Sequence, residues 1–133
     1  MKLERWDNVS GDYVDQLTSN VNYPWSPSQT DVLNSFEYSS SPNGANYGSR
    51  LRALITIPED GAYTFYISGD DAVELYLNEN GVNFRGASLI ARTSGWTHFR
   101  EWTKNSSQQS QVCLLYTSPS PRDYAASRMP SSA

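Results

Sequence analysis

The chain has 133 residues, of which 38% are hydrophobic and 13% aromatic, and its formal net charge is −4. This length allows at most one domain with a sizeable core, and the aromatic content is typical of a β-rich globular protein. Basic residues are scattered singly and no apolar run approaches roughly 20 residues, which argues against nucleic-acid binding and a membrane helix. A lone cysteine, Cys113, and a lone histidine, His98, exclude an intrachain disulfide and a Cys/His zinc site.

In chain order, the first part of the sequence predicts a short helical segment followed by a loop. Val14 and Leu17 lie three residues apart, which suits one or two helical turns, and Ser10 is the expected N-cap. Two prolines in the segment 23–31 (YPWSPSQTD) would interrupt regular structure, so a loop is expected there. The segment 32–38 (VLNSFEY) is expected to be a short strand.

The middle of the chain predicts a series of antiparallel strands separated by Gly-containing turns. The segment 50–57 (RLRALITI) alternates between apolar and polar faces, as a half-buried strand does. Further strands are expected at 63–68 (YTFYIS), 72–78 (AVELYLN) and 88–93 (SLIART), whereas 94–105 is aromatic and loop-like. Short strands with frequent turns and almost no helix predict an all-β fold, an antiparallel β-sandwich or barrel.

Two adjacent carboxylates, Asp70 and Asp71, interrupt this strand-rich region. One interpretation is a tight turn, because aspartate side chains bond nearby backbone N–H groups. The other is a ligand site. Successive side chains on a strand point to opposite faces, so two neighbours reach one ligand only if the backbone departs from a regular strand, through a bulge or a cis peptide. A hard cation such as Ca²⁺, which takes 6–8 oxygen ligands, would suit such a pair.

The stretch RLRALITIPEDGAYTFYISGDDAVELYLN resembles the core signature of the PA14 domain, a β-barrel module of toxins, yeast adhesins and bacterial glycosidases. This sequence departs from the family pattern at Gly69, which is inserted before the aspartate pair, and at Ala72, where Gly or Asn is frequent. The residues that match the pattern are Pro58, Gly61, Tyr63, Thr64, Phe65, Ser68, Asp70, Asp71, Leu75 and Leu77.

The resemblance implies a carbohydrate-binding module, calcium-dependent, that acts in adhesion or targeting. In lectin members of the family the paired aspartates are joined by a cis peptide and hold a Ca²⁺ that contacts sugar hydroxyls. The matching positions, Asp70 and Asp71, are therefore the expected metal and carbohydrate ligands. Trp96 is a candidate for stacking on a sugar, because an indole offers a flat amphipathic face. Nothing in 1–112 matches the later family loop that completes the calcium shell.

The resemblance also leaves alternatives open. The chain could be a non-catalytic accessory module of a larger secreted glycosidase, or a purely structural β-module with no ligand. Direct hydrolysis fits poorly, because glycosidases hold two carboxyl groups about 5–9.5 Å apart across the scissile bond. No catalytic residues are expected. A glycan partner and an extracellular or cell-surface location follow from the resemblance, although the N-terminus shows no apolar signal region.

The last segment, 113–133 (CLLYTSPSPRDYAASRMPSSA), differs in character from the rest of the chain. One interpretation is a Pro/Ser linker to another domain. The other is an artefact, because its natural back-translation resembles the transposase and flanking adapters of sequencing libraries, separated by an index-sized gap. On this interpretation 1–112 is a partial PA14-like domain, incomplete at its C-terminus, and 113–133 is a non-native tail.

Overall fold

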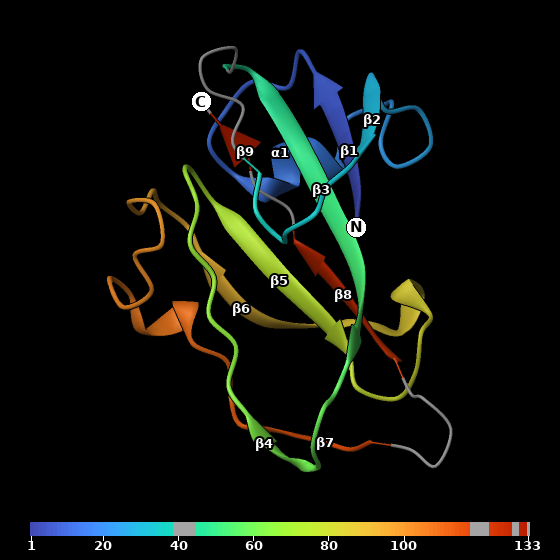
Figure 1. The fold of residues 1–133 in the computed structure, drawn as a ribbon. Helices are drawn as coiled ribbons and strands as arrows, with labels where there is room; N and C mark the ends of the chain where they lie inside the picture. Colours follow the sequence, from blue (N-terminus) through green and yellow to red (C-terminus); the bar gives the residue numbers. More distant parts are fainter. Residues whose placement is uncertain (39–44, 118–122, 129–130, 133) are drawn as a thin grey trace.

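Antiparallel strands make up most of the computed structural model, which describes residues 1–38, 45–117, 123–128 and 131–132 (Figure 1). The helical segments are α1 (Val14–Thr18) and the two 3-10 turns η1 (Phe84–Gly86) and η2 (Ser106–Gln108). The strands are β1 (Lys2–Asp7), β2 (Gln29–Val32), β3 (Tyr47–Thr56), β4 (Gly61–Tyr63), β5 (Val73–Asn78), β6 (Ser88–Thr93), β7 (Cys113–Leu115), β8 (Asp123–Arg128) and β9 (Ser131–Ser132).

Two sheets carry these strands. The larger has the order β2-β1-β3-β8-β5-β6, with β9 pairing β3, and the smaller pairs β4 with β7. Every pairing between the described strands is antiparallel. The expected all-β antiparallel class is therefore confirmed. The larger sheet is open among the described residues, ending at β2 and β6, so it is not a closed barrel.

Strand β3 confirms the alternation expected from its sequence. Leu51 is fully buried and lies opposite Leu3 of β1, whereas the side chain of Leu54 is 52% exposed. The face that carries Leu51 turns toward the main core. The opposite face carries Arg50 and Arg52, which pair with Glu4 of β1. A strand whose two faces meet different surroundings has its register fixed, because a one-residue slip would exchange them.

The short helix α1 covers one end of the sheet face that carries Arg50 and Arg52. Leu17 packs with Trp6 and Val9, and all three are buried. The expected helix is confirmed, but Ser10 is not its N-cap: that position is Tyr13, whose backbone N–H donates to the side chain of Gln16 (2.8 Å). The N-cap is later than expected because the helix begins at Val14, whereas a helix capped by Ser10 would begin at the next residue, Gly11.

Two expected strands are wrong in their bounds. Beyond Val32 the segment 32–38 is not a strand, because the chain start leaves only Met1, which exchanges hydrogen bonds with Leu33, to pair past Lys2. The strand here is β2, which ends at Val32 and begins at Gln29, so the end of the segment 23–31 that was expected to be a loop is a strand. Its four residues are all exposed on the sheet edge. The expected strand at 63–68 is reduced to β4 and one bridge at Tyr66, because its partner there is the 3-10 turn η2 and its flanks rather than a strand.

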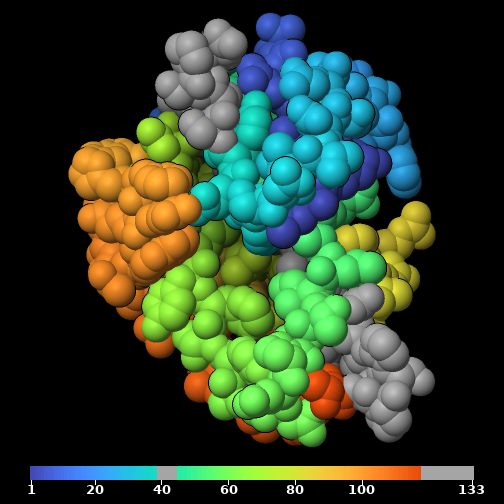
Figure 2. All heavy atoms as spheres, in the orientation of Figure 1, coloured from blue at the N-terminus to red at the C-terminus, as the bar shows by residue number. Residues whose placement is uncertain are grey.

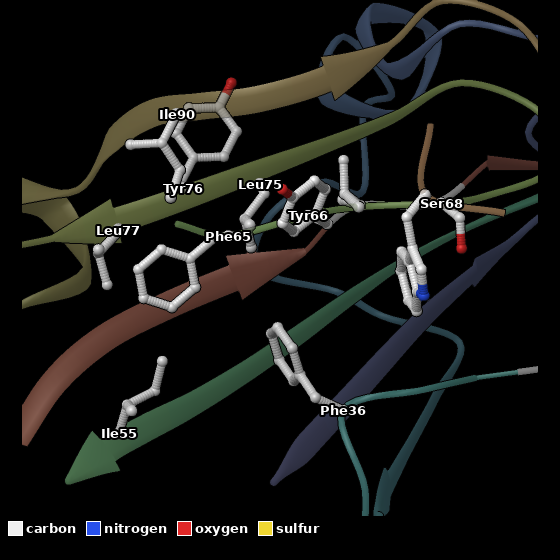
Figure 3. Close-up of a pocket in the computed structure, with 11 residues that line it drawn as sticks. Phe36, Ile55, Phe65, Tyr66, Ser68, Leu75, Tyr76, Leu77 and Ile90 are labelled. Atoms are coloured by element: carbon white, nitrogen blue, oxygen red, sulfur yellow. The ribbon is translucent and has the colours of Figure 1, made fainter. Parts of the chain in front are cut away.

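The main core lies between β3, β5 and β6 on one side and the 64–68 segment on the other. It contains a mostly apolar cavity of about 110 Å³. Figure 3 shows Phe36, Ile55 and Phe65, from three separate segments, facing a common space beside β5. Phe36 therefore contributes to the core although its segment is not a strand.

The stretch expected to be foreign takes part in both sheets. Strand β7 pairs with β4, and β8 lies between β3 and β5, with Leu51 and Leu75 both opposite Arg128. Because β3 and β5 do not pair with each other, β8 joins the two halves of the larger sheet.

Candidate functional site

The aspartate pair lies in the connection that leads into β5. Asp70 is exposed and Asp71 partly exposed, whereas Ser68, two residues before the pair, and Ala72, directly after it, are buried. The peptide bond between Asp70 and Asp71 is cis, in agreement with what the family resemblance implies. Two carboxylates are thus presented at the surface from a connection that is anchored at both ends.

Gly69 ties this connection to the loop that follows β6. Its backbone N–H donates to Thr97 Oγ1 (2.8 Å), and its carbonyl accepts from the Thr97 hydroxyl (3.1 Å) and the Thr97 N–H (2.7 Å). A Cβ at position 69 would meet Val73 Cγ1 at 2.1 Å, so no side chain fits there. The glycine that departs from the family pattern is therefore required by close packing.

The segment before α1 is also hydrogen-bonded to the connection that carries Asp70 and Asp71. The backbone N–H of Ala72 donates to the carbonyl of Asp12 (3.1 Å), and the side chain of Asp12 is exposed. Three segments far apart in the sequence therefore meet at Asp70 and Asp71. Sequence reasoning missed Asp12 and Thr97, since neither belongs to a recognisable motif. The inserted Gly69 was the one sequence signal for these contacts, because a glycine beside a strand often marks a place where another backbone segment approaches closely.

The structure brings Trp96 into the same neighbourhood, because it precedes Thr97. Its side chain is 48% exposed. The ammonium of Lys104 lies 3.8 Å from the centroid of its ring, and the same Nζ donates to the Trp96 carbonyl (2.8 Å). The ring of His98 packs edge-on at 4.8 Å between centroids. In Figure 2 the orange 94–105 segment projects at one side of the molecule, beside the yellow-green connection.

The donor set at this point is made of oxygen atoms, which suits a hard cation such as Ca²⁺ rather than zinc. Asp70 and Asp71 would supply two carboxylates, fewer ligands than Ca²⁺ takes. In the part of the chain that the structure describes, no three His, Cys, Asp or Glu side chains are grouped so that they could hold a metal ion. The two carboxylates suit Ca²⁺ chemically, and other oxygen atoms must complete its coordination shell.

Comparison with known protein families agrees with the resemblance seen in the sequence. The profile of the PA14 domain matches residues 17–83, which is half of the chain and includes the aspartate pair. The chain belongs to the PA14 domain family. No curated protein and no solved structure matches the chain. In the described part of this PA14 domain, no helix is long and apolar enough to cross a bilayer.

Proposed function

We propose that this PA14 domain is a calcium-dependent carbohydrate-binding module that serves adhesion or targeting and does not itself catalyse a reaction. The observation that supports this function best is the pair of carboxylates, exposed at Asp70 and partly exposed at Asp71, in a connection whose backbone is hydrogen-bonded to two other segments. The family is known in carbohydrate-binding and adhesin modules, and the site would act at the cell surface or outside the cell.

Asp70 and Asp71 would hold the cation, and their role is to fix its position. When bound, Ca²⁺ would supply coordination for two neighbouring hydroxyls of a sugar. The backbone bonds from Gly69 to Thr97 and from Ala72 to Asp12 limit how far the two carboxylates can move. Ligands held in place before binding lose less conformational entropy, which favours affinity.

Trp96 would form one wall of the sugar site. Because Lys104 lies against its ring, only the remaining exposed surface of the indole is open to a sugar. The Lys104 ammonium would offer a hydrogen-bond donor to hydroxyls beside that ring. Trp96 and Lys104 are thus expected to influence which sugar binds, whereas the aspartates determine whether any sugar binds.

The test is a titration with Ca²⁺ followed by a screen of neutral sugars on an array, using the full 133-residue chain and the variant Asp70→Asn/Asp71→Asn. The expected result is Ca²⁺ binding and calcium-dependent glycan binding by the original chain, both lost in the variant. Asp31→Asn is the matched control, because it makes the same chemical change on the exposed strand β2.

Calcium binding that survives the double substitution would contradict the proposed site. Glycan binding that is insensitive to a chelator would contradict its calcium dependence. If neither Ca²⁺ nor any glycan binds to the folded chain, the structural interpretation of the module is favoured instead. Binding only when the module is attached to a hydrolase would favour the accessory role in a larger glycosidase.

A further inference from the structure

A groove on the outer face of the larger sheet lies apart from the aspartate pair. The described residues of its floor come from β3 and β5, the two neighbours of β8 in the sheet. Its walls are the segments 23–25 and 82–87, which Figure 1 shows in light blue and yellow. The hollow has a volume of about 590 Å³ and contains neither Asp70 nor Asp71 among its lining residues. Its charged and aromatic lining residues are Arg50, Arg52, Arg85, Tyr23, Trp25, Tyr76 and Phe84.

The groove is cationic in a protein whose formal net charge is −4. No described lining residue is acidic. One buried carboxylate, Glu4, serves two of the arginines: its Oε1 lies 2.8 Å from Arg50 Nη2 and 2.9 Å from Arg52 Nη2. Two guanidinium groups therefore share one counter-charge, and a further N–H, at Arg52 Nε, has no acceptor among the described residues.

Arg85 adds a third cation at the rim. Its side chain is exposed, and no ion pair is found for it within the described part of the chain. A nearby acidic group outside the lining is Glu74, whose Oε2 accepts a hydrogen bond from the hydroxyl of Tyr76 (2.5 Å). The excess of positive charge in the groove is therefore carried by Arg52 and Arg85, which could each pair with a bound anion.

Aromatic rings line the same groove. The side chain of Trp25 is 81% exposed, an unusual position for a large indole that has no described ring partner. The guanidinium of Arg52 lies 5.2 Å from the ring centroid of Phe84, and that of Arg50 lies 5.2 Å from the centroid of Tyr23. These contacts orient the guanidinium groups while Trp25 is left open to a flat partner.

We propose that this groove is a second glycan site, which binds an acidic saccharide such as a uronic acid without calcium. The sugar ring would stack on Trp25, and its carboxylate would pair with Arg52 and Arg85, because a guanidinium matches a carboxylate in geometry and charge. Phosphate groups share this chemistry. A saccharide is chosen over a nucleic acid because the chain is acidic, with scattered basic residues, and this choice rests on the proposed function.

The experiment titrates the full chain with tetragalacturonate in the presence of a chelator, so that a calcium site at Asp70 and Asp71 cannot contribute. The methyl-esterified tetrasaccharide and inorganic phosphate are titrated in parallel. The expected result is binding of the acid and about tenfold weaker binding of both the ester and phosphate. Arg85→Gln and Trp25→Ala should each weaken binding of the acid about tenfold.

The substituted side chains are exposed, so both variants should keep the fold, and a thermal unfolding curve checks this. Lys2→Gln is the control, because it removes one exposed positive charge outside the groove. The proposal would be overturned if the acid and its ester bind equally, or if phosphate binds as tightly as the saccharide. It would also be overturned if Arg85→Gln weakens binding no more than Lys2→Gln. Asp70→Asn should leave this binding unchanged, which separates a failure here from a failure of the calcium site.

Discussion

Thr97 and Gly69 are joined by three hydrogen bonds that occupy both backbone polar groups of Gly69. Thr97 is 4% exposed, so its hydroxyl makes these bonds away from bulk solvent. The pair connects the loop after β6 to the residue that directly precedes Asp70. The position of the two carboxylates therefore depends on a residue that has no ligand role of its own.

Thr97→Val is expected to lower the free energy of unfolding by about 1–3 kcal/mol, because the Gly69 N–H loses its acceptor while the shape of the side chain is kept. Chemical denaturation measures this change, with the exposed Thr103→Val as the control. If Asp70 and Asp71 bind Ca²⁺ as proposed, the affinity should fall as well, because the connection loses a hydrogen bond that positions them. A stability change no larger than that of the control would show that the bond contributes little.

Gly69→Ala is expected to destabilise the fold by about 1–3 kcal/mol, because the new methyl group would overlap Val73 Cγ1. Gly95→Ala is the matched control, since a Cβ there meets nothing within 4 Å. The double variant Gly69→Ala/Val73→Ala should cost less than the sum of the two single substitutions. Strict additivity in denaturation experiments would count against the steric explanation.

Glu4→Gln is expected to cost about 3 kcal/mol, because Arg50 and Arg52 would face a neutral amide while remaining largely buried. The measurement is urea denaturation at neutral pH. Glu59→Gln, on an exposed turn, provides the comparison. If the two variants lose similar stability, the shared carboxylate does not hold the two arginines as described.

Asp60 is expected to titrate below its ordinary pKa of 3.8, because the hydroxyl and the backbone N–H of Thr117 both donate to its Oδ1. A carboxyl whose pKa is lower in the folded state stabilises the fold above the unfolded-state pKa. That contribution is lost as the pH falls through the folded-state value. An NMR titration of the Asp60 carboxyl carbon measures the shift.

The same titration tests the position of the segment after β7. Thr117→Val should raise the Asp60 pKa part of the way toward its ordinary value, because one of two donors is removed. Thr30→Val, on β2, should leave it unchanged. An Asp60 carboxyl that titrates identically in the original chain and in Thr117→Val would mean that Thr117 does not bind Asp60, in the turn before β4.

The coding DNA offers a check on the expected foreign tail. If 113–133 derives from sequencing adapters, reading the genomic DNA past the codon of Val112 should give a sequence that diverges at Cys113. A strand followed by a loop rich in Asp and Asn would then support the proposed calcium site. A genome that encodes CLLYTSPSPRD would refute the artefact interpretation.

Local pattern was enough to predict several elements of this fold. The alternation of apolar and polar residues along β3 and β5 identified these strands, because burial of one face acts residue by residue. The segments 32–38 and 63–68 were mispredicted for the opposite reason. Each has strand-like composition, but whether a strand forms there depends on a partner from elsewhere in the chain.

The sequence by itself determined that this is an all-β PA14 domain with adjacent carboxylates at Asp70 and Asp71, because residue spacing and strand periodicity are local properties. Only the tertiary structure decided that Thr97 and Asp12 hold this connection. It also decided that arginines of β3 meet the 23–25 and 82–87 segments in one groove. These relationships join residues dozens of positions apart, and they exist only once the sheet has set which strands are neighbours.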